Sequence, residues 1–149
     1  MKTSIVTFLI TFCFYLSAYA QASQDKAAEL KEQALSSLKQ KDYIKARYLF
    51  KKAYEAFAAR ENYPQAIECG IQANALYVRE NFYKEGFELC RDMEQFIWTG
   101  EQKQKKVFYD LRFPISKERL QMYIALKNPA QAKNQLDKLE EMAKLAKND

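Results

Sequence analysis

An aromatic residue followed three places later by a small residue returns every 20 positions in the middle of the chain. The pattern occurs as Tyr43–Ala46, as Tyr63–Ala66 and as Tyr83–Gly86. An interval of 20 residues holds one helix and one tight turn, so the period predicts a stack of similar helices. Such an array buries apolar side chains between neighbouring helices and presents others along its faces. The period therefore indicates a protein that binds a partner.

The first residues have the pattern of a secretory signal. Lys2 precedes an apolar run from Ile5 to Leu16, and Ala18–Ala20 places small residues where a signal peptidase cleaves. We expect a signal peptide over residues 1–20 and an exported domain over residues 21–149, periplasmic or secreted. The alternative is an uncleaved anchor, although the run is shorter than the ~20 apolar residues that span a membrane.

Charge and composition argue against several classes of function. Without Lys2 the chain has 23 basic and 19 acidic side chains, which are interspersed, and the sequence contains no histidine. The interspersed charges favour solubility over nucleic-acid binding. Without histidine, an acyl-transfer triad or a histidine-ligated metal site cannot form in the usual way. We therefore expect no enzymatic activity, no cofactor, no metal and no nucleic-acid partner.

The chain reads as all-α, with about six helices. Glycine and proline occur only three times each, and helix-forming residues dominate. Apolar stripes predict helices over about 24–39, 63–79 and 83–98, one from the Asp42 cap through Phe57, one from the Asn128-Pro129 cap, and a kinked helix or two short ones over 101–126. Thr99-Gly100 is expected to end the fourth helix, and Pro114 to interrupt the fifth segment. Paired in order, the helices give hairpins at about 24–60, 62–98 and 101–147.

Only Cys69 and Cys90 lie beyond the expected signal peptide. In an exported protein such a pair can be oxidised to a disulfide, and both residues are expected at similar heights on neighbouring helices. A disulfide needs Cα atoms ~5.5 Å apart, however, whereas packed helix axes lie ~8–10 Å apart. Free buried thiols are therefore favoured over a disulfide, and the pairing stays open.

The first hairpin resembles the tetratricopeptide repeat. Its turn is similar at Tyr43, and Ala46, Phe50 and Ala53 match the small, aromatic and second small positions of the repeat's second helix. The later units match more weakly, at Gly86 and Cys90, at Ala132 and Leu136, and one helix earlier at Ala66. The resemblance implies a right-handed α-solenoid of three antiparallel hairpins. Spacings of 40 and 46 residues between Ala46, Gly86 and Ala132 exceed the roughly 34 residues of the standard repeat, so the helices are expected to be longer.

An exported, lysine- and tyrosine-rich array of this kind is similar to the periplasmic input region of Bacteroidetes-type signalling proteins. In those proteins the repeats precede a membrane helix and an output domain. The resemblance implies a sensory role and contact with a membrane only as part of a larger chain. Nothing follows Asp149 here, so the alternatives are a free-standing repeat protein and the first part of a longer one.

The resemblance also suggests where a partner would bind. Asn74, Tyr77 and Arg79 fall at first-helix positions that line the concave groove of such arrays, so we expect a protein or peptide to contact them. The alternative is that the tyrosines only seal the hairpin interfaces. The short basic cluster at Lys103, Lys105 and Lys106 is either a solvated helix start or a contact for an anionic lipid or an acidic partner.

Two functions follow from this reading. The leading one is a non-enzymatic protein- or peptide-binding module. The alternative is a structural scaffold that self-associates, with a homo-oligomer as its consequence.

Overall fold

The computed structural model describes residues 26–147, and all regular secondary structure in that range is helical. This confirms the all-α class. A first helix occupies the described residues 26–39, and the helices that follow are α2 (Tyr43–Ala58), α3 (Tyr63–Arg79), α4 (Tyr83–Gln104), α5 (Tyr109–Ala125) and α6 (Pro129–Leu145). The predicted signal peptide at residues 1–20 lies outside the described residues.

One type of turn joins most consecutive helices and explains the period of the sequence. Just before four of the helices stands a residue with a left-handed backbone: Lys41, Glu61, Asn81 and Lys127. The next N–H donates to the carbonyl five residues back, as Asn62 does to Phe57 at 3.1 Å, which closes the preceding helix. The Asn62 side chain also accepts from the Gln65 N–H at 3.4 Å and so caps α3. Successive helices therefore begin 20 residues apart at Tyr43, Tyr63 and Tyr83 and again from Tyr109 to Pro129, whereas α4 and the segment after it fill 26 residues.

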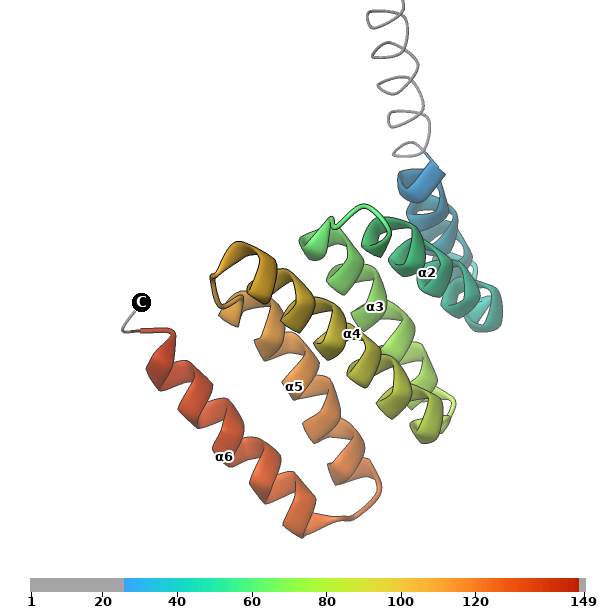
Figure 1. The fold of residues 1–149 in the computed structure, drawn as a ribbon. Coiled ribbons are helices and arrows are strands. Elements are labelled where there is room, and N and C mark those ends of the chain that lie inside the picture. The colour runs from blue at the N-terminus through green and yellow to red at the C-terminus, as the bar shows by residue number, and fades with distance from the viewer. Residues whose placement is uncertain (1–25, 148–149) are drawn as a thin grey trace, which may run out of the picture.

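The helices lie side by side in chain order (Figure 1). Each of α2 to α5 contacts the helix that follows it, and α3 also contacts α5. Helix 26–39 reaches α3 through Lys31, which donates to Gln65 Oε1 at 2.9 Å and pairs with Glu68 at 2.7 Å. Alternate helices therefore touch across one layer, formed by helix 26–39, α3 and α5. Within the described residues no comparable contact joins α4 and α6.

The core follows the expected repeat positions, with one departure. The residues predicted to pack between repeats are buried at Ala46, Phe50, Ala53, Ala66, Gly86 and Cys90, and half-buried at Tyr43 and Ala132. Leu136 departs from this pattern because it is 46% exposed, whereas Phe50 and Cys90, at the equivalent positions, are 1% and 0% exposed. α3 packs on α2 and α5 packs on α4, but no described helix follows α6 to cover Leu136.

The prediction that Thr99-Gly100 ends the fourth helix is wrong, because α4 continues to Gln104. Gly100 has a negative φ and is buried, and a Cβ at this position would overlap the ring of Tyr63. This glycine therefore allows close packing of α4 on Tyr63 rather than a left-handed helix end.

The segment expected to form a kinked helix or two short ones over 101–126 is divided differently. Residues 101–104 complete α4, residues 105–108 form a turn, and α5 is a single helix that contains Pro114. The first turns of this helix are held from outside by Glu101, which binds both Phe108 and Arg112.

Cys69 and Cys90 are free and buried, as the sequence favoured. Burial raises the pKa of each thiol to about 12, so both behave as small apolar side chains. Among the described residues, no helix has the length and hydropathy needed to cross a membrane.

Candidate functional site

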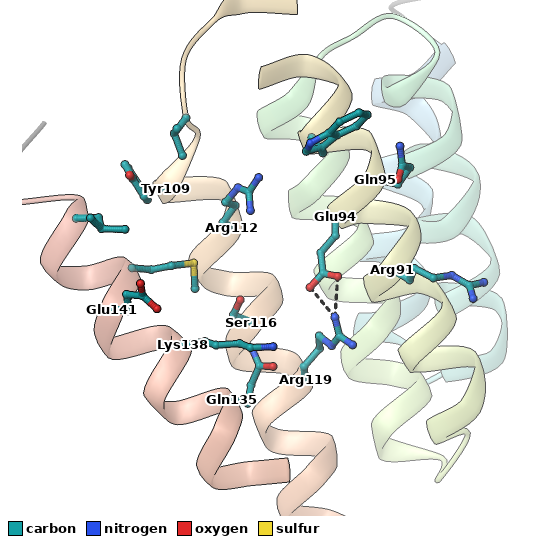
Figure 2. Close-up of a pocket in the computed structure, with 14 residues that line it drawn as sticks. Arg91, Glu94, Gln95, Tyr109, Arg112, Ser116, Arg119, Gln135, Lys138 and Glu141 are labelled. Atoms are coloured by element: carbon teal, nitrogen blue, oxygen red, sulfur yellow. Dashed lines mark hydrogen bonds and ion pairs between the residues drawn. The ribbon is translucent and has the colours of Figure 1, made fainter. Parts of the chain in front are cut away.

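A groove lies between α4 and α6, with α5 as its floor. Its central hollow has a volume of about 710 Å³. The hollow is lined by one stripe on each helix, with Tyr109, Arg112, Ser116 and Arg119 on α5, Arg91, Glu94, Gln95 and Trp98 on α4, and Gln135, Lys138, Glu141, Met142 and Leu145 on α6. Figure 2 shows the side chains of Ser116, Gln135 and Lys138 approaching the same space from α5 and α6. The groove exists because α4 and α6 do not close over α5.

Two smaller hollows continue the groove along α4. The first shares Arg91 with the central hollow and reaches Lys84 near the start of α4. The second shares Trp98 and reaches Lys105 just beyond the end of α4. The 22 residues of α4 rise by about 33 Å, so the groove is long enough for an extended or helical segment of another protein.

Two ion pairs fix the arginines of the floor against the α4 wall. Arg119 Nη1 donates to both carboxylate oxygens of Glu94, at 2.8 and 2.7 Å (Figure 2). Arg112 pairs with Glu101 through Nη2 and donates from Nε to Glu101 Oε1 at 2.7 Å. Side chains that would otherwise reach across the groove are therefore held to one side of it.

Glu101 also organises the turn between α4 and α5. Its Oε1 accepts the backbone N–H of Phe108 at 2.8 Å, in addition to the bond from Arg112. Burial alone would raise the pKa of this carboxyl, but the hydrogen bonds from Arg112 and Phe108 outweigh burial and hold its pKa below the usual value. Glu101 is therefore charged at neutral pH and holds the last turn of α4 to the start of α5 at one end of the groove.

Several polar groups in the groove have no partner among the described residues. Ser116 and Gln135 are only 8% and 7% exposed, yet neither side chain makes a hydrogen bond within residues 26–147. Arg91 and Lys138 likewise form no ion pair there. The polar atoms of Ser116 and Gln135 are not fully enclosed, so the groove offers them as unused donors and acceptors to a ligand.

One end of the groove is apolar at its rim. Trp98 is 51% exposed although it is large and apolar, and Val107 and Leu145 beside it are exposed as well. Tryptophan is among the residues that contribute most to binding at protein interfaces. No sequence pattern singles out Trp98.

A stripe on α3 occupies the position that the floor occupies on α5. The α3 stripe consists of Tyr63, Ala66, Gly70, Ala73 and Tyr77, and the α5 stripe, 46 residues later, consists of Tyr109, Arg112, Ser116, Arg119 and Tyr123. No comparable groove opens over the α3 stripe, because the Tyr63 ring stacks on Phe96 of α4 at 4.6 Å and Tyr54 of α2 meets Phe96 edge-on at 6.4 Å. Side chains of α2 and α4 thus fill the space over α3 that stays open over α5.

The three residues predicted to line a concave groove lie in different surroundings. Asn74 is fully buried and donates from Nδ2 to Glu118 Oε2 on α5 at 3.1 Å. Tyr77 is half-buried, with the guanidinium of Arg47 4.8 Å from its ring centre. Arg79 is exposed and lies 3.9 Å from the ring centre of Tyr43. Asn74 is therefore inaccessible to a partner in this conformation, and partner binding by Tyr77 and Arg79 stays a prediction.

The acidic side chains of the floor and α4 wall are mostly engaged in ion pairs. Within residues 26–147 no group of three or more cysteine, aspartate or glutamate side chains is arranged to hold a metal ion. The carboxylates nearest the floor, Glu94 and Glu101, are each held by an arginine. Comparisons with protein-family models, with curated proteins and with solved structures gave no match, so the groove is interpreted from its own geometry.

Proposed function

We propose that this protein is a non-enzymatic module that binds a protein or peptide segment in the groove between α4 and α6. The observation that carries the proposal is a groove with an exposed tryptophan at its rim, into which Ser116 and Gln135 present polar atoms that make no hydrogen bond within residues 26–147. A peptide backbone supplies both donors and acceptors, and side chains along it reach the apolar rim and the unpaired cations. Small ligands would fill only part of a groove that follows the whole of α4.

Peptide display tests this function directly. Randomised peptides are selected on the purified protein, and binding of individual peptides is followed by the fluorescence of Trp98, the only tryptophan in the chain. We expect selected peptides to shift this fluorescence and to lose affinity for Ser116→Phe, which places a ring in the groove, and for Val107→Asp at the exposed rim. Ser36→Phe, on the exposed surface of helix 26–39, is the matched control. Equal binding to all four proteins, or no selected peptide, contradicts the proposal.

The architecture behind this function is proposed to be a right-handed solenoid of three antiparallel hairpins, similar to the tetratricopeptide repeat. The contacts among helix 26–39, α3 and α5 support it, because first helices of successive hairpins touch in such arrays. The longer α4 accounts for the wider spacing between the second and third units. An experimental structure with helices of successive units related by a regular right-handed rotation is the expected result, and an irregular bundle would contradict it.

We propose export to the periplasm or to the outside of the cell, with the groove acting as the input site of a signalling protein. The support is the sequence of residues 1–20. N-terminal sequencing of the protein recovered from its native host is expected to begin at Gln21. Recovery of the protein with residues 1–20 intact and in the cytosolic fraction would contradict export.

Self-association is a second candidate, and one observation favours it. Leu136 is exposed at a position where the two preceding units bury Phe50 and Cys90. A second copy that covers α6 would bury Leu136. Light scattering across a range of concentrations is expected to show a dimer that Leu136→Lys dissociates, and a monomer at every concentration would remove this candidate.

A further inference from the structure

We infer that the occupant of the groove is an acidic amphipathic segment of a partner protein. The segment would place carboxylates against Arg91 and Lys138 and an apolar side chain against Trp98. This inference rests on the proposed peptide-binding function and adds the chemistry of the partner. Its support comes from the charge balance of the groove, from the position of Trp98 and from the composition of the chain outside the described residues.

Positive charge exceeds negative charge along the groove. The central hollow and its two continuations are lined by seven arginines and lysines and by four glutamates. The two ion pairs of Arg112 and Arg119 neutralise two residues of each sign. The remaining side chains are Lys84, Arg91, Lys105, Lys106 and Lys138 against Glu88 and Glu141. The groove therefore attracts an acidic segment, and the attraction is stronger in its partly enclosed parts than on open surface.

The basic cluster at residues 103–106 is divided by the structure. Lys103 pairs with Glu61, at the turn before α3. Lys105 and Lys106 instead line the hollow next to Trp98 and form no ion pair among the described residues. Both lysines are therefore available to meet a carboxylate of the occupant that follows its apolar anchor.

The two binding positions have a defined separation. Arg91 and Trp98 are seven residues apart on α4, which corresponds to a rise of about 10 Å. An occupant that lies along α4 as a helix therefore carries its carboxylate and its apolar anchor about seven residues apart. Helices that dock in grooves present anchors at this spacing.

The undescribed residues 1–25 do not have this chemistry. They are mainly apolar and contain one lysine and one acidic residue, Asp25. A single carboxylate leaves one of Arg91 and Lys138 unpaired. A flat anionic membrane could meet the exposed lysines, but it cannot reach Ser116 and Gln135, which are buried on the floor and wall. The charge and the recess together favour a segment of another protein.

A charge-swap experiment tests the inference. The probe is a 20-residue helical peptide with glutamates and leucines seven residues apart, and its twin carries lysines in place of the glutamates. We expect the acidic peptide to bind at least tenfold more tightly than the basic twin, to shift Trp98 fluorescence and to weaken as salt is raised. Arg91→Glu combined with Lys138→Glu is expected to reverse this preference. Lys26→Glu combined with Lys39→Glu is the matched control on helix 26–39 and is expected to leave it unchanged.

Each other outcome has a meaning. If displayed peptides bind the groove but the acidic probe binds no better than its basic twin, the inference fails and the proposed function stands. If peptides of neither charge bind and none is selected by display, both fail. Binding to phosphatidylserine vesicles that the groove double variant abolishes, without binding of the acidic peptide, overturns the inference in favour of a membrane surface.

Discussion

The α3 stripe and the α5 stripe lie at equivalent positions, but the α5 stripe is open and the α3 stripe is covered except at Tyr77, which lines a smaller hollow of about 350 Å³ against α2. On α3 the three inner positions are Ala66, Gly70 and Ala73, and the small side chains let Met93 and Tyr54 approach the helix. On α5 the same positions are Arg112, Ser116 and Arg119. Two arginines paired with Glu101 and Glu94 thus stand on the floor where α3 has small residues, so the flanking helices do not approach α5 as closely as they approach α3.

The helices that flank the two stripes also carry different residues. Tyr54 of α2 covers Gly70, whereas Glu94, 40 residues later on α4, pairs with Arg119. Phe96 of α4 fills the space above α3, whereas Met142, 46 residues later, lines the open groove. One helical plan thus gives a closed interface with small and aromatic residues and an open groove with paired charges.

Placing an arginine in the closed interface is expected to have the largest effect. Ala73→Arg introduces the residue that α5 has at Arg119, but the equivalent of Glu94 is Tyr54, so the buried guanidinium has no carboxylate. We expect a loss of about 3–5 kcal/mol in the free energy of unfolding. Urea denaturation followed by circular dichroism measures it. The double variant Ala73→Arg/Tyr54→Glu supplies a carboxylate for this guanidinium and is expected to recover part of the lost stability. No recovery would contradict the equivalence of the α3 and α5 stripes.

Removing the charge that holds the open groove is expected to have the next largest effect. Glu101→Gln loses the ion pair with Arg112 and weakens the bond from the Phe108 N–H, so we expect a loss of about 2–3 kcal/mol near pH 7. The pKa of Glu101 is lowered in the folded state, so its stabilisation is present above the unfolded pKa of about 4.3 and is lost as the pH falls through the lower folded value. Denaturation of the two proteins from pH 7 to pH 2.5 should therefore converge. A difference independent of pH would show that Glu101 acts by packing alone.

The sequence was sufficient for the helices whose ends are marked by caps. Asp42 and Asn128 cap α2 and α6 as predicted, and Asn62 caps α3 in the same way, because an Asx side chain followed by the apolar stripe is a local signal. The end of α4 could not be predicted from Gly100, because a glycine that ends a helix and a glycine that admits a neighbouring ring look alike in sequence. Only the contact with Tyr63 distinguishes them.

The arginines that distinguish the α5 stripe are visible in the sequence, but the sequence prediction places a groove at other residues. Asn74, Tyr77 and Arg79 were selected by analogy with a concave face, and Asn74 proves to be buried between α3 and α5. A comparison of residues 63–77 with residues 109–123 would have shown arginines where the earlier stripe has alanines. What the sequence could not give was the pairing of Arg112 with Glu101 and of Arg119 with Glu94, because these contacts depend on how α4 and α5 face each other.

Exchanging the central residue of each stripe is expected to lower the stability moderately at the α3 stripe and hardly at all at the α5 stripe. Gly70→Ser places in the closed interface the residue that α5 has at Ser116, and its Cβ would overlap Met93. The Met93 side chain can move, so we expect a loss of about 1–2 kcal/mol in the free energy of unfolding. Ser116→Ala in the open groove is the matched change and is expected to alter stability by less than about 0.5 kcal/mol. Equal losses in the two variants would mean that the α5 stripe is packed as tightly as the α3 stripe.

Glycine substitutions in the turns are expected to have the smallest effect on stability. The effect is expected to be the same in the turn before α2 and in the turn before α6. Lys41 precedes α2, Lys127 precedes α6, and both have a left-handed backbone with φ of 62° and 53°. Glycine adopts this conformation without strain, so Lys41→Gly and Lys127→Gly are each expected to raise the free energy of unfolding by about 0.5–1 kcal/mol. Thermal denaturation of the two variants measures the gain. Similar gains would show that the turns are equivalent and that the floor and wall residues alone separate the closed interface from the open groove. A gain at Lys41 without one at Lys127 would instead place part of the difference in the connection between α5 and α6.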